Sequence, residues 1–200
     1  MSIRKWATAD WHLGEDRFEI MARPFKTKGE QVQRLIKLHN ELVAPTDLVY
    51  VLGDVCYKEA PDYLSYVKDF NGQKILVRGN HDEGIKDAEF KKYFDEVIAH
   101  GDGIELEIEG IDCYLTHYPT RGRPDRFNLV GHIHSAWKYQ LNMFNVGVDT
   151  NHFRPVDLAT IPQHLGGISK YYDEDVWVAY NDLNKKYRGE RGKPGSYFKD

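Results

Sequence analysis

The chain has 200 residues, of which 41% are hydrophobic and 29% charged, and its formal net charge is −4. This composition is typical of a soluble folded domain and excludes global disorder. The acidic balance gives no reason to expect bulk binding of nucleic acid through a basic surface. A nucleotide or a short oligonucleotide stays open as a substrate.

The first half of the chain alternates predicted strands with predicted helices. The helices show apolar side chains at helical spacing, and the strands are short, nearly continuous apolar runs of the kind that is buried on both faces. The predicted strands are residues 3–9, 47–52 and 74–77, and the predicted helices are 30–42, 61–70 and 86–93. This alternation predicts a mostly parallel α/β sheet.

The second half changes pattern, because alternating segments around Gly110 predict a β-hairpin. Its predicted elements are strands at 103–109, 111–116, 127–130 and 143–148, followed by short helices at 157–165 and 174–187. We expect one domain over residues 1–187. The Gly-rich, basic segment 188–200 is expected to be a flexible tail.

Two features indicate a cytoplasmic protein. Cys56 and Cys113 lie in apolar surroundings, which predicts buried free thiols in a reducing compartment. The amino terminus lacks the apolar core of a signal peptide, and no run approaches the roughly 18 apolar residues of a membrane span. We therefore predict no association with a membrane.

Side chains that bind metals or move protons follow the predicted strands, where ligands gather in open α/β sheets. They are Asp10, His12, Asp54, Asn80, His81, Asp82, His117, His132 and His134. Imidazole, carboxylate and amide groups without a thiolate favour Mn, Fe, Zn or Ni over Ca or a structural zinc site. Even without His81 and Asp82, seven candidate ligands remain, which exceed the needs of one ion. Two ions sharing a bridging carboxylate would use them all, and such pairs serve phosphoryl chemistry.

The order of these residues resembles that of a known family. The blocks are Asp10-x-His12, Gly53-Asp54, Gly79-Asn80-His81-Asp82, His117 and Gly131-His132-x-His134. They resemble the calcineurin-like metallophosphoesterase superfamily, and the segments 116–119 and 145–149 resemble its small bacterial and phage branch. The resemblance implies an α/β/β/α sandwich with two sheets. It also implies hydrolysis of phosphodiester or phosphomonoester bonds in a small nucleotide-like substrate.

The resemblance also implies a role for each residue. Asp10, His12 and His134 would hold one divalent metal; Asn80, His117 and His132 would hold the other; Asp54 would bridge both. Manganese is the expected metal, with nickel, iron or zinc as alternatives. A hydroxide held by the metals would attack phosphorus.

The remaining implied roles concern the substrate. His81 would contact the phosphate and protonate the leaving oxygen, and Asp82 would orient His81. Asn80, His81 and Arg78 are the expected substrate contacts. Alternatively, Asp82 begins the helix at 86–93, where a carboxylate favours the helix dipole, and Arg78 is a solvated residue at a strand end.

Other residues keep two interpretations. Trp11 either stacks on a base or packs against the sheet, and the arginines at 121, 123 and 126 either contact an anionic substrate or are ordinary loop charges. The segment 131–134 could instead continue a strand with both histidines on one side. Tyr57 resembles the iron ligand of purple acid phosphatases, but His12 stands where those enzymes have Gly, so we do not expect it to bind metal.

Two other functions remain as alternatives. One is a nuclease that acts on short oligonucleotides, which the local basic segments 121–126 and 188–193 allow. The other is a non-catalytic metal-binding scaffold, although such proteins tend to lose the histidine that is present here as His81. The sequence does not determine the substrate, the preference for monoester or diester, or the oligomeric state.

Overall fold

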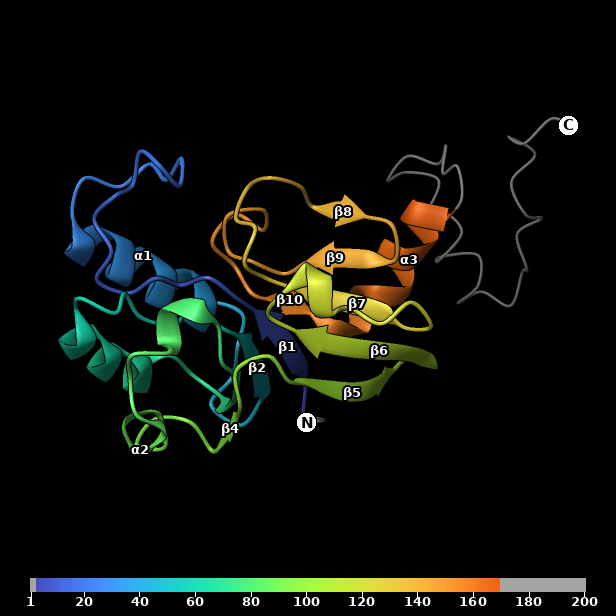
Figure 1. Ribbon diagram of the computed structural model, residues 1–200, viewed down its shortest axis with the longest axis horizontal. Helices are drawn as coiled ribbons and strands as arrows, with labels where there is room; N and C mark the ends of the chain where they lie inside the picture. The colour runs from blue at the N-terminus through green and yellow to red at the C-terminus, as the bar shows by residue number, and fades with distance from the viewer. Residues whose placement is uncertain (1–2, 170–200) are drawn as a thin grey trace, which may run out of the picture. The chain divides into compact units, whose positions relative to one another are not determined.

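Two five-stranded sheets form the framework of residues 3–169, the part of the chain that the computed structural model describes (Figure 1). The first sheet has the strand order β10-β1-β2-β3-β4. Its strands are β1 (Lys5–Thr8), β2 (Leu48–Leu52), β3 (Gln73–Val77), β4 (Glu96–Ile98) and β10 (Val156–Asp157). Strands β1 to β4 are parallel and β10 is antiparallel to β1, which confirms the predicted parallel sheet.

The second sheet has the order β5-β6-β7-β9-β8. Its strands are β5 (Gly103–Ile108), β6 (Ile111–Thr116), β7 (Phe127–Val130), β8 (Tyr139–Gln140) and β9 (Met143–Asn145). The β5–β6 hairpin is the predicted one, and β6, β7 and β9 run parallel. The sequence did not indicate β4, β8 or β10, because two or three residues are too few to show a periodicity.

The helical segments differ from the expectations mainly in type and length. They are α1 (Lys28–Asn40), η1 (Pro61–Asp69), η2 (Asn80–Asp82), α2 (Asp87–Phe90), η3 (Pro119–Arg121), η4 (Leu158–Thr160) and α3 (Ile161–Ser169). The segment predicted as a helix at 61–70 is a 3-10 helix. It buries Leu64 and Val67 as an α-helix would, so the spacing of the apolar residues does not distinguish an α-helix from a 3-10 helix here. The predicted helix at 174–187 and the tail at 188–200 lie outside the described residues.

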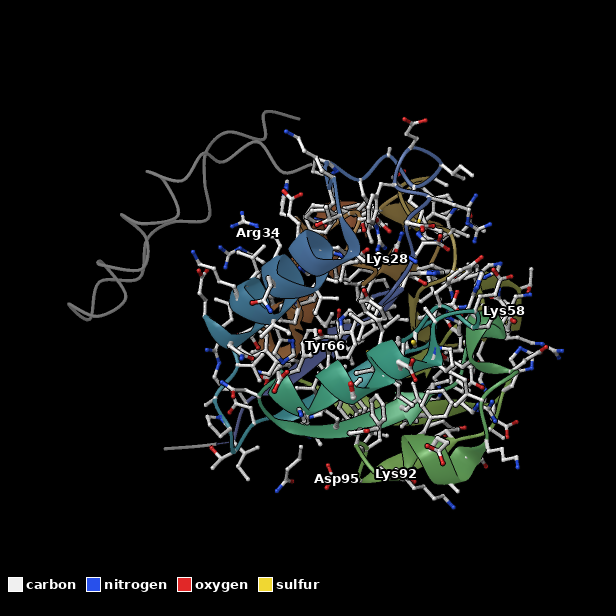
Figure 2. The ribbon with its side chains drawn as sticks, turned by 90° about the vertical axis from the view of Figure 1, so that its left-hand side faces the viewer. Lys28, Arg34, Lys58, Tyr66, Lys92 and Asp95 are labelled. Carbon is white, nitrogen blue, oxygen red and sulfur yellow. The ribbon has the colours of Figure 1, made fainter. Side chains whose placement is uncertain are left out.

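The main core lies between the first sheet and the helices on one of its faces. Figure 2 shows α1 and η1 in front of this sheet. Val32 and Leu35 of α1 and Val67 of η1 belong to the same buried cluster as alternate residues of the strands. Trp11 is buried in this cluster and stacks on Phe70 with ring centroids 4.2 Å apart, so it packs in the core instead of offering a surface to a base.

The opposite face of the first sheet is also buried. Ala7, Tyr50 and Leu52 alternate with the residues of the helical core, and all three are buried. A bridge between Ala9 and Gly147 joins the chain after β1 to the chain after β9. The two-sheet α/β fold expected from the resemblance is therefore confirmed.

Three further observations bear on the sequence predictions. The chain divides into compact units at Met1–His164 and Leu165–Asp200, and the first contains both sheets. Cys56 and Cys113 are buried free thiols, as predicted. Among residues 3–169 we find no helix with the length and apolar character that a bilayer crossing needs.

Candidate metal centre

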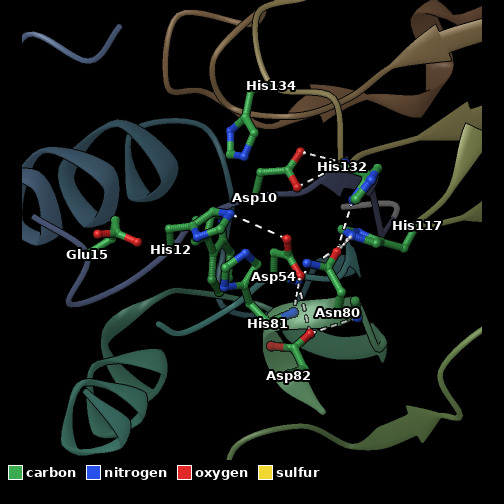
Figure 3. Close-up of polar contacts among 12 residues, drawn as sticks. Asp10, His12, Glu15, Asp54, Asn80, His81, Asp82, His117, His132 and His134 are labelled. Carbon is green, nitrogen blue, oxygen red and sulfur yellow. Dashed lines mark hydrogen bonds and ion pairs between the residues drawn. The ribbon is translucent and has the colours of Figure 1, made fainter. Parts of the chain in front are cut away.

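The carboxyl ends of five strands meet at one place between the sheets. The loops after β1, β2, β3, β6 and β7 carry all nine candidate residues, and Figure 3 shows the side chains turned toward a common centre around Asp54. The structure thus brings together every member of the set: Asp10, His12, Asp54, Asn80, His81, Asp82, His117, His132 and His134.

Five of these residues have a left-handed backbone. They are Asp10, His12, Asp54, His132 and His134, with φ between 47° and 75°. This conformation costs roughly 1–2 kcal/mol for an L-residue, is tolerated best by small polar side chains, and collects at functional sites. It turns the chain sharply directly after β1, β2 and β7. Strand β7 has ended at Val130, so the segment 131–134 is not the continued strand that the sequence also allowed.

Glycines beside the carboxylates make the close packing of the centre possible. A Cβ atom at Gly147 would lie 2.6 Å from Oδ2 of Asp10, and one at Gly53 would lie 2.5 Å from Nδ1 of His117. A Cβ atom at Gly79 would overlap the carboxylate of Asp54. The glycines of the Gly-Asp and Gly-Asn-His-Asp blocks are therefore required by the space that the ligands occupy.

Asp54 lies between two groups of potential ligands. Its Oδ2 is 3.4 Å from Nε2 of His12, and its Oδ1 is 3.5 Å from Nε2 of His117. The carboxylate is buried, yet its pKa lies well below the usual range, because the effect of burial is outweighed by His12 and His117. The two oxygens of one ionised carboxylate thus face two different imidazoles, as a bridging ligand requires.

One group of ligands consists of Asp54, Asn80, His117 and His132. Nδ1 of His117 donates to the carbonyl oxygen of Leu52 at 2.7 Å, and burial lowers the pKa of His117 to about 4, so its Nε2 carries a lone pair. This lone pair lies 3.1 Å from Oδ1 of Asn80, which is itself an acceptor. Nδ1 of His132 is 2.9 Å from the same oxygen. Converging acceptors of this kind fit a cation.

The other expected group is Asp10, His12, Asp54 and His134. On this side the ligand atoms of His12, Asp54 and His81 lie within 4.8 Å of one another, so His81 also lies within reach of a metal here. His12 is buried; within the described part of the chain its Nδ1 has no hydrogen-bond partner, and its Nε2 has only the long contact with Asp54 at 3.4 Å. Burial and the charge of Asp54 raise the pKa of the Asp10 carboxyl group to about 8. The rings of His12 and His134 have centroids 4.9 Å apart. Because buried polar atoms are rarely left without a partner, these groups also fit a cation.

Asp82 does not meet His81 as we predicted. Its buried carboxylate accepts hydrogen bonds from the backbone amides of Asp54 at 2.9 Å, Val55 at 3.0 Å and Gly79 at 2.9 Å. The ring atom Nδ1 of His81 has no hydrogen-bond partner among the described residues. Asp82 therefore holds the loop after β3 against the turn that carries Asp54, and the prediction that it orients the imidazole is corrected.

Arg78 is also placed differently from the prediction that it binds substrate. Its guanidinium group donates to Asp87 at 2.6 Å and to the carbonyl oxygens of Ile85 and Asp82, and it lies over the ring of Phe90. These contacts fold the segment after β3 back onto Arg78. The structure favours a structural role for this residue.

The loop arginines likewise pair with acidic residues of the hairpin. Arg123 pairs with Glu105, and Arg126 lies 2.7 Å from Asp112. The hydroxyl group of Tyr57 donates to Glu59 at 2.9 Å, which agrees with the expectation that Tyr57 is not a ligand. These contacts favour the interpretation of Arg123 and Arg126 as loop charges.

Two functional residues escaped the sequence analysis. Asp149 accepts from Nε and NH2 of Arg23 at 2.7 and 2.9 Å, and its Oδ2 is 2.8 Å from Nδ1 of His134. Arg23 also donates to the carbonyl oxygens of Asp10 and Trp11. This pair fixes the ring of His134 and the loop after β1. A signal for Asp149 existed, since it follows the predicted strand at 143–148 as the other ligands follow theirs.

A cavity of about 200 Å³ adjoins the centre. It is lined by His12, Glu15, Arg17, Ile20, Met21, His81 and His134. The candidate ligands His12 and His134 and the candidate acid His81 thus share one wall of the cavity, while the loop after Leu13 forms the other. A small molecule in this cavity would reach the metal centre.

Comparison with known proteins agrees with this geometry. The family model for calcineurin-like phosphoesterases matches residues 3–183. The chain belongs to the calcineurin-like phosphoesterase family. Membership implies metal-dependent hydrolysis of phosphoesters, and it confirms the family expected from the sequence blocks.

Individual relatives add little about a substrate. An uncharacterised protein of Methanocaldococcus jannaschii is 28% identical over 178 residues, which cover 80% of this chain and 91% of that protein. The gene 66 protein of Mycobacterium phage L5 is 31% identical over 80 residues, or 38% of this chain and 39% of that protein. A crystal structure of a protein of unknown function from Aquifex aeolicus matches with a TM-score of 0.63 and 24% identity, over 82% of this chain and all of that one.

Proposed function

We propose that the protein is a dinuclear metal-dependent hydrolase that cleaves phosphodiester or phosphomonoester bonds of a small nucleotide-like substrate. The position of Asp54 carries this proposal. Its two carboxylate oxygens lie 3.4 and 3.5 Å from Nε2 of His12 and of His117, which belong to separate groups of ligands. Structural zinc sites hold one ion in a closed shell, whereas paired sites with a shared carboxylate serve phosphoryl transfer.

The ligand sets follow from the two groups around Asp54. Asp10, His12 and His134 would hold one ion; Asn80, His117 and His132 would hold the other; Asp54 would bridge them. Manganese is the metal we propose, with nickel, iron and zinc, which imidazole donors also suit, as alternatives. When bound, such ions lower the pKa of water and neutralise charge on the phosphoryl group.

His81 is the proposed general acid. Its backbone amide donates to Oδ1 of Asp54 at 2.9 Å, so the residue is tied to the bridging carboxylate itself. Its ring lies 4.7 Å from the ring of His12, and the ring atom Nδ1 has no partner among the described residues. An imidazole that is held beside the centre but keeps a free nitrogen can contact the phosphate and give a proton to the leaving oxygen.

The first experiment measures hydrolysis of p-nitrophenyl phosphate and bis-p-nitrophenyl phosphate by the full chain. The protein is stripped with a chelator and then supplied with Mn²⁺, Ni²⁺, Zn²⁺, Fe²⁺ or Mg²⁺ separately. We expect turnover only with added metal and none in Asp54→Ala. Two bound equivalents of metal without turnover of either ester would overturn the hydrolase and favour a scaffold.

A second experiment addresses His81 with esters that differ in their leaving group. We expect His81→Ala to keep two equivalents of metal and to lose turnover of an alkyl phosphate by roughly 10²- to 10⁴-fold. The p-nitrophenyl esters should suffer less, because p-nitrophenolate leaves without a proton. Wild-type turnover of the alkyl phosphate in this variant would show that another group is the acid.

A further inference from the structure

An ion pair between buried Glu15 and half-exposed Arg17 lines the cavity. Glu15 is 1% exposed, and its Oε1 accepts from the backbone amides of Asp16 and Arg17, each at 3.0 Å. The same carboxylate accepts from Nε and NH2 of Arg17 at 2.9 and 2.6 Å. Both oxygens of Glu15 are thus engaged by the pair, and the guanidinium group is held in one orientation.

Arg17 keeps donors for another ligand. A guanidinium group has five N–H donors in a planar fork, and Glu15 engages only the edge formed by Nε and NH2. The side chain of Arg17 is 51% exposed. Its remaining edge has no hydrogen-bond partner among the described residues, and it presents two parallel donors, the geometry that matches a phosphate group.

The location of Arg17 connects it to the metal centre. Arg17 and Glu15 line the 200 Å³ cavity together with His81 and His12, and Figure 3 shows Glu15 beside His12. The guanidinium carbon lies 5.0 Å from the ring centre of Tyr57, which lies 6.3 Å from that of His81. Arg17 is thus within about 11 Å of the imidazole of His81.

A second hollow continues outward from the same residues. It has a volume of about 540 Å³ and is lined by Asp16, Arg17, Phe18, Glu19, Ile20, Phe25 and Lys26. Arg17 and Ile20 line both spaces, so the two hollows are neighbours with Arg17 between them. A substrate larger than one phosphate ester would extend from His81 past Arg17.

We infer that Arg17, held by Glu15, binds a second phosphate group of the substrate, on the side of the leaving alcohol. This inference rests on the proposed function, in which the metal ligands and His81 act on the scissile phosphate. Arg17 faces the same cavity but belongs to neither ligand group. The substrate class is then a phosphoester whose leaving group carries a further phosphate, and Arg17 is the residue that selects it.

The test compares two ligands that cannot be hydrolysed, phenylphosphonate and benzene-1,4-diphosphonate, which differ by one anionic group. Their affinities for the full Mn²⁺-loaded chain are measured by titration calorimetry, and their inhibition constants against bis-p-nitrophenyl phosphate are measured in parallel. We expect wild type to bind the diphosphonate at least about 10-fold more tightly, as a bidentate charged contact allows. In Arg17→Gln this ratio should fall to near one.

Arg4→Gln is the matched control. Arg4 is also 51% exposed and also paired with one carboxylate, that of Asp157, but it precedes β1 and so lies at the opposite end of that strand from Asp10. This variant should keep the wild-type ratio. Equal affinities of wild type for the two ligands, or an unchanged ratio in Arg17→Gln, would overturn the inference. Failure of the proposed function itself would appear separately, as absent turnover of bis-p-nitrophenyl phosphate by wild type.

Discussion

Replacement of Asp82 by Asn separates the role that the structure gives this residue from the role that the sequence suggested. In the structure, the carboxylate receives three backbone amides, from Asp54, Val55 and Gly79. The Asn side chain has nearly the same shape, but one of its two terminal atoms is an NH₂ group. That NH₂ group would face at least one backbone amide N–H, so two hydrogen-bond donors would point at each other and the hydrogen bond there would be lost.

The magnitude follows from the hydrogen bonds that are lost. Burial and the charge of Asp54 raise the pKa of Asp82 to about 7. Each hydrogen bond to it therefore contributes between the roughly 0.5–1.5 kcal/mol of a neutral pair and the roughly 1.5–3 kcal/mol of a charged one, and a buried donor left without a partner costs about 1–3 kcal/mol. We expect Asp82→Asn to lower the free energy of unfolding by on the order of 3 kcal/mol. For a chain of this size, that corresponds to a fall in Tm of roughly 6–12 °C.

The effect on activity follows from the position of Asp54. Because Asp82 holds the turn that carries Asp54, the proposed bridging ligand, the variant should bind metal more weakly, by roughly 10- to 100-fold. Turnover of esters with good and poor leaving groups should then fall by similar factors. Urea unfolding, metal titration and the two classes of ester measure these three effects.

The opposite pattern would refute this reasoning. If Asp82 acted through His81, the variant would keep its stability and its metal affinity and would lose turnover only with poor leaving groups. Asp87→Asn is the matched control in the same segment. Asp87 is 56% exposed, and Arg78 keeps its bonds to the carbonyl oxygens of Asp82 and Ile85 without it, so this variant should lose only about 0–1 kcal/mol of stability.

Three further predictions concern other parts of the molecule. Gly79→Ala should abolish metal binding measured by titration, because its Cβ atom would overlap the carboxylate of Asp54. Asp149→Asn should lower the free energy of urea unfolding by about 3–5 kcal/mol, because it leaves the fully buried side chain of Arg23 without its counter-ion. Burial lowers the pKa of His39 from 6.5 to about 4. The free energy of unfolding should therefore decrease as the pH is lowered from 6.5 to 4, and the decrease should be larger in wild type than in His39→Gln by on the order of 3 kcal/mol.

The sign of the last prediction follows from proton uptake. In the unfolded chain His39 takes up a proton near pH 6.5, whereas in the folded chain it does so only near pH 4. The stability that the neutral side chain contributes is therefore fully present above pH 6.5 and is lost as the pH falls toward 4. Parallel pH curves for wild type and His39→Gln would contradict it.

For the Gly79→Ala prediction, Gly84→Ala is the control, since its Cβ atom would meet nothing within 4 Å. Loss of metal binding in Gly84→Ala too would contradict the steric reasoning. Unchanged stability in Asp149→Asn would show that Arg23 finds another partner.

The sequence by itself determined which residues gather at the centre. Each candidate ligand follows a predicted strand, and the carboxyl ends of parallel strands share an edge, so local patterns sufficed to place Asp10, Asp54 and His81 together. The same patterns predicted the parallel sheet and the hairpin. They failed for β4, β8 and β10, which are formed by pairing with a neighbour and are too short to show a periodicity of their own.

Only the tertiary structure decided which partner each side chain takes. The bond from Asp82 to the amide of Asp54 spans 28 positions, and the pair Arg23–Asp149 spans 126. Periodicity reports burial and element type, which are local properties, whereas a hydrogen-bond partner depends on the loops that close over each strand end. For the same reason, the sequence offered Arg78 as a phosphate ligand. The folded chain instead turns Arg78 onto its own backbone and leaves Arg17 facing the cavity.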